Sequence, residues 1–132
     1  MKLICCFMTL FNRTNAPWGL GRTSPDSDDS LSFLKARTSA QALNYTYTYD
    51  SSAVTGVDVY VVDSGVYVEH EQFGGRARWG TTSIGTPNID YDGHGTHCAG
   101  VVASQQFGIA KNASIIAVKV FSDDGGGYIS SL

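Results

Sequence analysis

The chain has 132 residues, of which 42% are hydrophobic and 16% are charged, and its formal net charge is −3. This length holds one domain at most, and the composition is that of a folded globular protein and argues against a disordered chain. Lysine and arginine are scattered singly, so we expect no nucleic-acid surface and no polybasic membrane patch.

The N-terminus carries Lys2 followed by a short apolar run, LICCFMTLF. This run resembles the hydrophobic part of a signal peptide and is far too short to span a bilayer. No small-residue cleavage site follows clearly, so a secretory signal and an arbitrary apolar leader both stay open. We interpret residues 1–14 as a leader and residues 15–132 as the folded domain. Cys98 is the only cysteine outside the leader, and no disulfide framework is predicted.

The first part of the domain gives weak signals. Residues 15–25 are rich in glycine and proline and predict an extended surface segment. Residues 26–44 combine polar punctuation with a weak helical pattern.

The second part of the domain predicts a strand, a helix and another strand. The run VDVYVV at 57–62 is rich in β-branched and aromatic residues and is stopped by Asp63-Ser64-Gly65. Apolar residues recur at helical spacing within 95–104, with Asp92 as a candidate cap, and SIIAVKV at 114–120 predicts the second strand. This alternation predicts an α/β fold with a mainly parallel sheet flanked by helices.

Two short segments could carry chemistry. Asp63 follows a strand, and functional groups of parallel sheets gather at that end, although Asp-Ser-Gly is also common turn chemistry. His94 and His97 open the predicted helix, where either a catalytic or a structural histidine fits. Both histidines and Cys98 could also ligate a metal, but the spacing differs from the four-residue His pair of zinc peptidases.

The two segments in combination are more specific. VYVVDSGV at 59–66 and DGHGTHCAG at 92–100 closely resemble the Asp and His motifs of the subtilisin-like serine peptidases, in the same order. NAPWGL at 15–20 is similar to the mature start of the proteinase K branch of that family. Further similarity at QFGGRA, FGIAK, VKV and GGG extends the resemblance over nearly everything after residue 14.

The resemblance implies the N-terminal part of a subtilisin-like fold. It implies that Asp63 is the carboxylate of an Asp/His/Ser triad, that His94 is its general base, and that Cys98 packs beside His94 without a chemical role. Gly125, Gly126 and Gly127 match the edge segment that pairs with an extended peptide substrate. The Asp58 position often carries a disulfide-forming cysteine in relatives, and that bridge is not expected here.

The serine motif of the family is not found up to Leu132, so the chain is expected to be truncated and inactive alone. The resemblance implies a secreted, monomeric full-length endopeptidase that acts on proteins or peptides. No cofactor is expected within these residues, although calcium sites are possible in the full-length enzyme. Two alternatives stay open: a non-catalytic pseudo-protease or binding module, and an aspartic protease built on Asp63-Ser64-Gly65.

Overall fold

The computed structural model describes residues 10–16, 20, 45–50, 54–82 and 87–123. It divides into two units, Met1–Ala53 and Val54–Leu132, each considered separately. The predicted weak helix at 26–44 and the apolar start of the leader at 1–9 lie outside the described residues.

The first unit contains a two-stranded antiparallel sheet of β1 (Leu10–Ala16) and β2 (Tyr45–Asp50). Strand β2 reads YTYTYD, an alternation that is typical of a strand. Tyr47 is buried and stacks on Tyr49 with ring centroids 5.3 Å apart. Residues 10–14, interpreted from the sequence as part of a leader, therefore belong to a strand, and the domain boundary at residue 14 stays a prediction.

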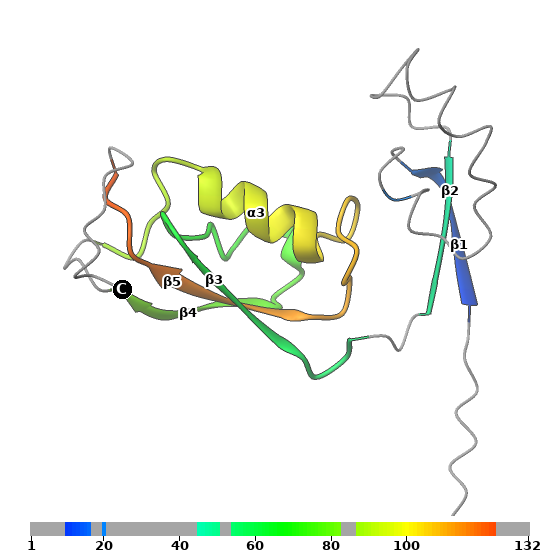
Figure 1. The fold of residues 1–132 in the computed structure, drawn as a ribbon, viewed down its shortest axis with the longest axis horizontal. Helices are drawn as coiled ribbons and strands as arrows, with labels where there is room; N and C mark the ends of the chain where they lie inside the picture. The colour runs from blue at the N-terminus through cyan, green and yellow to red at the C-terminus, as the bar shows by residue number, and fades with distance from the viewer. Residues whose placement is uncertain (1–9, 17–19, 21–44, 51–53, 83–86, 124–132) are drawn as a thin grey trace, which may run out of the picture. The chain divides into compact units, whose positions relative to one another are not determined.

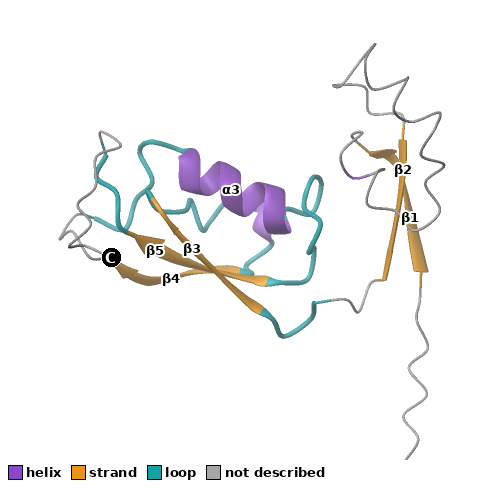
Figure 2. Cartoon of the chain, in the orientation of Figure 1, coloured by secondary structure: helices purple, strands orange, loops and turns teal. Residues whose placement is uncertain are grey.

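In the described residues of the second unit, a three-stranded parallel sheet carries the helix α3 packed on it (Figures 1 and 2). The strand order is β3-β5-β4, so the last of these three strands in the sequence lies in the middle. The elements of this unit, in chain order, are β3 (Asp58–Asp63), the 3-10 turn η1 (Glu71–Phe73), β4 (Ala77–Thr82), α3 (His94–Ala103) and β5 (Ser114–Lys119).

The structure confirms the three elements predicted in this unit, β3, α3 and β5. No end of these elements differs from its predicted position by more than one residue. Strand β4 was not predicted, because ARWGTT lacks an apolar run and contains a glycine. β4 is defined by its pairing with β5, a long-range contact that no local pattern reports. Strong apolar patterns in the sequence therefore predicted β3, α3 and β5, whereas the residues of β4 do not predict a strand by themselves.

The core of the unit lies between α3 and one face of the sheet. Strand β5 is buried along most of its length, as its central position requires. On strand β3, Tyr60 and Val62 are 63% and 49% exposed because, among the described residues, only the face toward α3 is covered. The buried core residues are Val61, Val66, Phe73, Ala99, Ala103, Ala113, Ile115 and Ala117.

Candidate active site

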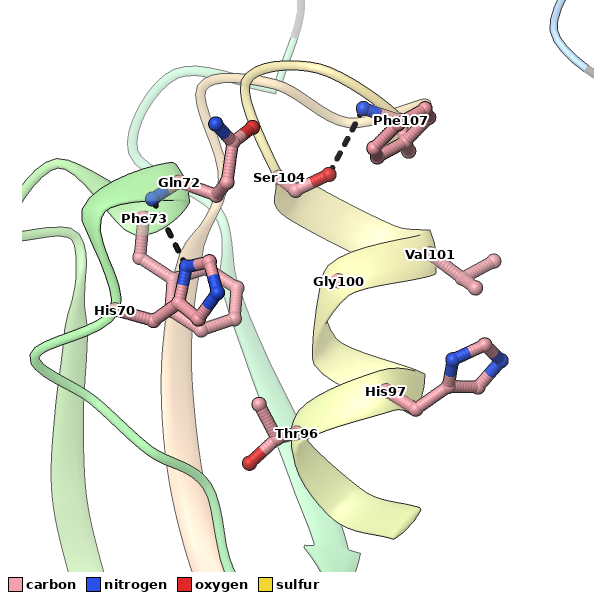
Figure 3. Close-up of a pocket in the computed structure, with 9 residues that line it drawn as sticks. All are labelled: His70, Gln72, Phe73, Thr96, His97, Gly100, Val101, Ser104 and Phe107. Atoms are coloured by element: carbon pink, nitrogen blue, oxygen red, sulfur yellow. Dashed lines mark hydrogen bonds between the residues drawn. The ribbon is translucent and has the colours of Figure 1, made fainter. Parts of the chain in front are cut away.

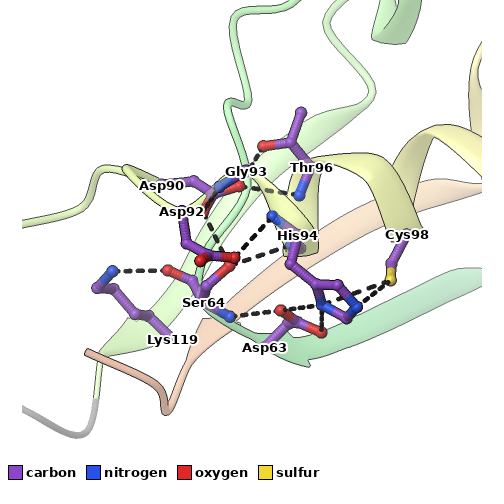
Figure 4. A network of polar contacts seen from close by, with 10 residues as sticks. Asp63, Ser64, Asp90, Asp92, Gly93, His94, Thr96, Cys98 and Lys119 are labelled. Carbon is purple, nitrogen blue, oxygen red and sulfur yellow. Dashed lines mark hydrogen bonds and ion pairs between the residues drawn. The ribbon is translucent and has the colours of Figure 1, made fainter. Parts of the chain in front are cut away.

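The carboxyl end of β3 lies beside the first turn of α3, at one edge of the sheet (Figure 4). Asp63 is the last residue of β3 and His94 is the first residue of α3. Parallel strands direct their carboxyl ends to the same edge of a sheet, where the connecting segments bring functional side chains together. The sequence prediction that these two residues are neighbours in space therefore has a simple topological basis.

The carboxylate of Asp63 and the imidazole of His94 form a close pair. His94 Nδ1 lies 2.9 Å from both Asp63 Oδ1 and Asp63 Oδ2. The Ser64 backbone N–H donates to Asp63 Oδ1 at 2.7 Å, which fixes the carboxylate. The Asp63 side chain is 13% exposed and the His94 side chain is 65% exposed. The pair thus joins a largely buried acceptor to an imidazole whose other edge is open.

The pair changes the acidity of the imidazole. The hydrogen bond to Asp63, together with the charge of that carboxylate, raises the pKa of His94 above its usual value of 6.5. Asp92 and Asp90 raise it further through their charges, whereas desolvation acts in the opposite direction. Because Asp63 faces Nδ1, the neutral imidazole carries its proton there and leaves Nε2 as the basic atom.

The first turn of α3 is capped differently from the sequence prediction. Asp92 was the candidate cap, but the cap position is Gly93, which has a left-handed φ of 86° and no side chain. Asp92 Oδ2 instead accepts from the His94 backbone N–H at 3.1 Å. Two carboxylates, those of Asp90 and Asp92, therefore bind backbone donors at this helix start, where negative charge is favourable.

Gly95 lets the helix approach the strand. A Cβ at this position would lie 2.0 Å from the Gly65 carbonyl oxygen and 3.1 Å from Asp63 Cβ. Any larger residue would push the start of α3 away from the end of β3. The glycine after His94 is thus a geometric requirement of the pair with Asp63.

Two charged residues that no sequence motif singled out, Asp90 and Lys119, hold this region together. Asp90 accepts hydrogen bonds from Ser64, Gly93 and Thr96. Lys119, which is fully buried, donates from Nζ to the carbonyl oxygens of Ser64 and Ile89 at 2.6 and 3.1 Å and contacts Asp123 at 2.8 Å. A lysine inside an otherwise apolar central strand was the available signal, since a buried ammonium needs acceptors.

Cys98 contacts the imidazole, and the three ligand-type side chains of Asp63, His94 and Cys98 lie within 4.8 Å of one another. Cys98 Sγ is 3.9 Å from both Nδ1 and Nε2 of His94. The in-plane lone pairs of the two ring nitrogens diverge, so a sulfur at equal distance from both is aligned with neither. The arrangement consequently fits packing against the ring and not a preformed metal site.

His97 lies apart from the Asp63–His94 pair. It lines a mostly apolar groove of about 270 Å³ beside α3, together with His70, Phe73 and Phe107 (Figure 3). Neither Asp63 nor His94 lines this groove. The metal combination of His94, His97 and Cys98 considered from the sequence is therefore not assembled.

No serine or threonine of the described ranges donates to His94 Nε2. The Ser64 hydroxyl is engaged elsewhere, because it donates to Asp90 and accepts from the Gly95 backbone N–H at 3.1 Å. Gly125, Gly126 and Gly127, the predicted substrate-binding segment, lie outside the described residues. The structure thus describes an Asp/His pair whose basic nitrogen is directed away from its carboxylate.

The profile of the subtilase family of peptidases matches residues 54–132. The chain belongs to the subtilase family. It is 48% identical over 124 residues to Subtilisin-like protease 2 of Pseudogymnoascus destructans, covering 93% of this chain and 28% of that protein. It is 48% identical over 118 residues to Subtilisin-like serine protease Rho m 2.0101 of Rhodotorula mucilaginosa, covering 89% of this chain and 32% of that protein.

A solved structure gives the same result for the subtilase fold. The crystal structure of a cold adapted subtilisin-like serine proteinase superposes with a TM-score of 0.71 at 35% identity, covering 89% of this chain and 39% of that chain. The chain therefore has a subtilisin-like fold, as predicted, and spans about a third of the length of the proteins that it matches. Among the described residues, no helix is long and apolar enough to cross a membrane.

Proposed function

We propose that this chain supplies the Asp and His of a serine endopeptidase triad, with Asp63 as the carboxylate and His94 as the general base. The observation that carries the proposal is the 2.9 Å contact between His94 Nδ1 and Asp63, with Nε2 left available. The serine nucleophile is expected from sequence outside these 132 residues, so the chain alone is expected to be inactive.

In the proposed reaction, Nε2 of His94 takes the proton of the serine hydroxyl as that oxygen attacks the peptide carbonyl. His94 then carries positive charge, which the buried carboxylate of Asp63 stabilises without accepting the proton. His94 next donates that proton to the leaving amine, and the acyl-enzyme is hydrolysed by water. The raised pKa of His94 is consistent with this stabilisation of the imidazolium.

The same contact favours this scheme over an aspartic protease built on Asp63-Ser64-Gly65. In that alternative the Asp63 carboxylate would act with a second aspartate on a water molecule. Here its side-chain partner is His94, which has no role in such a mechanism. A non-catalytic pseudo-protease fragment is the alternative that the experiment below addresses.

The remaining features of the proposal follow from the sequence. The substrates are proteins or peptides, and Gly125–Gly127 bind the substrate main chain by strand addition. Gly126→Pro in an active enzyme is expected to raise KM, and an unchanged KM would contradict the assignment. We also propose that the full-length protein is a secreted monomer, with the apolar N-terminal run as the basis for secretion.

The test uses a chimera in which this chain replaces the matched 124 residues of Subtilisin-like protease 2. We expect the chimera to hydrolyse a chromogenic peptide and to be inactivated by a serine-directed phosphonate. His94→Ala is expected to abolish turnover, whereas His97→Ala, a matched control three residues away on the same helix, retains it. In subtilisin itself, loss of the histidine costs a factor of about 2 × 10⁶ in kcat.

Two results would contradict the proposal. Turnover by the chimera that survives His94→Ala would show that the histidine is not the base. An inactive chimera that nevertheless folds would favour the pseudo-protease alternative. The 132-residue chain serves as a further control, since phosphonate-sensitive turnover by this chain alone would reveal a nucleophile that our sequence analysis did not recognise.

A further inference from the structure

A second carboxylate, that of Asp90, lies beside the Asp63–His94 pair without touching the imidazole (Figure 4). Its Oδ1 accepts from the Ser64 hydroxyl at 2.8 Å and from the Gly93 backbone N–H at 2.9 Å. Its Oδ2 accepts from the Thr96 backbone N–H at 2.9 Å and also from the Thr96 hydroxyl. One half-buried side chain thus receives four hydrogen bonds.

The donors of these bonds lie on both sides of the pair. Ser64 directly follows Asp63 at the end of β3, whereas Gly93 and Thr96 flank His94 at the start of α3. The Ser64 hydroxyl also accepts from the Gly95 backbone N–H, which adds a direct link between the strand end and the helix. Asp90 therefore joins the chain neighbours of both members of the pair.

The segment that carries Asp90 is itself anchored. Buried Lys119 donates to the carbonyl oxygen of Ile89, the residue before Asp90, and to that of Ser64. Lys119 is the register partner of Asp63 in the β3–β5 ladder. The central strand thus holds both Ser64 and the segment of Asp90, which restricts how far Asp90 can move relative to β3.

We propose that Asp90 is a positioning residue, which sets the distance and orientation of His94 relative to Asp63 by binding Ser64 on one side and Gly93 and Thr96 on the other. This inference rests on the proposed function of the pair. A carboxylate suits the role because each of its oxygens accepts two bonds, whereas an asparagine amide has one acceptor oxygen. An NH₂ group placed at Oδ2 would face the two Thr96 donors.

The charge state of Asp90 supports the role. Burial would raise the pKa of Asp90, but the hydrogen bonds from Thr96, Gly93 and Ser64 outweigh it and hold that pKa below its ordinary value. The carboxylate is therefore ionised throughout the neutral range in which the imidazole titrates. The charged groups near His94 are Asp63 from β3 and Asp90 and Asp92 from the segment before α3.

The test compares Asp90→Asn with Asp92→Asn. Both substitutions remove one negative charge near His94, and Asp92 contributes more than Asp90 to the raised pKa of the imidazole. A role through charge alone therefore predicts that Asp92→Asn lowers the pKa of His94 by the larger amount. The oxygen that asparagine keeps suffices for the single bond of Asp92 to the His94 backbone N–H but not for the four bonds of Asp90. A positioning role predicts that Asp90→Asn lowers the pKa of His94 by the larger amount, because this substitution also disturbs the hydrogen bond between His94 and Asp63.

The pKa of His94 is measured by NMR titration of its ring signals. The samples are the 132-residue chain and the chimera that has not been treated with the phosphonate inhibitor. The deshielded Nδ1–H signal, which reports the bond to Asp63, is followed in the same samples. We expect this signal to weaken or broaden in Asp90→Asn and to persist in Asp92→Asn. Equal signals in the two variants, with the pKa lowered more by Asp92→Asn, would overturn the proposal.

A second pair of variants tests the hydrogen bond between Asp90 and the Thr96 hydroxyl by changing Thr96. Thr96→Val removes, at nearly constant shape, a hydroxyl that donates to Asp90 and accepts from the Tyr67 backbone N–H at 2.8 Å, whereas Thr96→Ser keeps both bonds. In the chimera, we expect Asp90→Asn and Thr96→Val to lower kcat by about 10- to 100-fold with little change in KM, as for a misplaced catalytic group. Thr96→Ser is expected to retain most of kcat, and equal losses in both threonine variants would contradict the proposal.

The two proposals fail in different ways. If the unsubstituted chimera folds but has no peptidase activity, the proposed function fails, while the NMR comparison of Asp90→Asn and Asp92→Asn still decides the positioning role. If the chimera is active and Asp90→Asn behaves like Asp92→Asn in kcat and in the Nδ1–H signal, the positioning role fails and the proposed function stands.

Discussion

Strand β3 begins and ends with an aspartate, and each of the two is paired with a side chain from another element. Asp58 lies 3.1 Å from the Arg78 guanidinium on β4, and the two side chains are 42% and 59% exposed. Asp63 lies 2.9 Å from the His94 imidazole and is only 13% exposed. The same residue type in the same strand thus forms an exposed ion pair at one end and a largely buried pair at the other.

The difference arises from what surrounds each carboxylate. At the carboxyl end, the Ser64 backbone N–H, the start of α3 and buried Lys119 hold the chain around Asp63. At the amino end, Asp58 on β3 and Arg78 on β4 meet across the central strand β5, and both side chains are exposed. Water screens charges of the exposed pair, whereas partial burial strengthens the interaction of Asp63 with its partner.

The largest expected effect distinguishes the two aspartates directly. Asp63→Asn in the chimera is expected to lower kcat by about four orders of magnitude, because an amide can donate to Nδ1 and select the wrong imidazole tautomer. Asp58→Asn is expected to leave kcat within about twofold, since exposed pairs contribute little. The measurement is kcat on a chromogenic peptide, and similar losses in the two variants would remove the contrast between the strand ends.

The close approach of α3 to β3 is tested by stability. Gly95→Ala is expected to lower the free energy of unfolding by about 1–3 kcal/mol, because the new Cβ would overlap the Gly65 carbonyl. Gly100→Ala, on the same helix, meets nothing within 4 Å and is expected to raise it by about 0.5–1 kcal/mol. Urea unfolding of the chimera measures both, and equal shifts would contradict the close contact at Gly95.

The pH dependence of stability sharpens the comparison further. A raised folded-state pKa means that the His94–Asp63 pair stabilises the fold fully below the unfolded pKa, near 6.5, and loses this contribution as pH rises through the folded pKa. Unfolding free energies of the parent and of Asp63→Asn should therefore differ most at acidic pH and converge above neutrality. A difference that grows with pH would have the wrong sign for this pair.

The pH dependence of catalysis is expected to run opposite to that of stability, because activity increases as pH rises. Peptide hydrolysis needs the neutral imidazole, so kcat/KM of the chimera is expected to rise with pH through a value above 6.5. A rise centred below 6.5 would show that Asp63 does not stabilise the imidazolium.

The smallest expected effect belongs to the exposed pair. Asp58→Asn is expected to change the free energy of unfolding by at most about 1 kcal/mol, and this change should shrink at high salt. Urea unfolding at low and high ionic strength measures it. A large loss of unfolding free energy that does not depend on salt would contradict the difference between the exposed pair of Asp58 and the largely buried pair of Asp63.

Local patterns in the sequence were sufficient for three elements, whereas the pairing of Asp63 with His94 was what the family resemblance implied. The apolar runs of β3 and β5 and the helical spacing of α3 carry strong periodic patterns, which predict an α/β unit without tertiary information. Asp63 stands at the end of a parallel strand, where functional groups gather, but its partnership with His94 was expected from the family resemblance and not from periodicity. The glycines around His94 were visible as a motif, although the Gly65 contact of Gly95 was not.

Tertiary structure decided what depends on partners distant in the chain. Strand β4 exists through pairing with β5, and the register that places Lys119 opposite Asp63 is a property of the assembled sheet. Asp90 is an ordinary polar residue in the sequence, and its role comes from donors 26 residues before it and within the helix that follows. Periodicity reports which side a residue faces, whereas hydrogen bonds between segments depend on how those segments pack, and no local pattern encodes that.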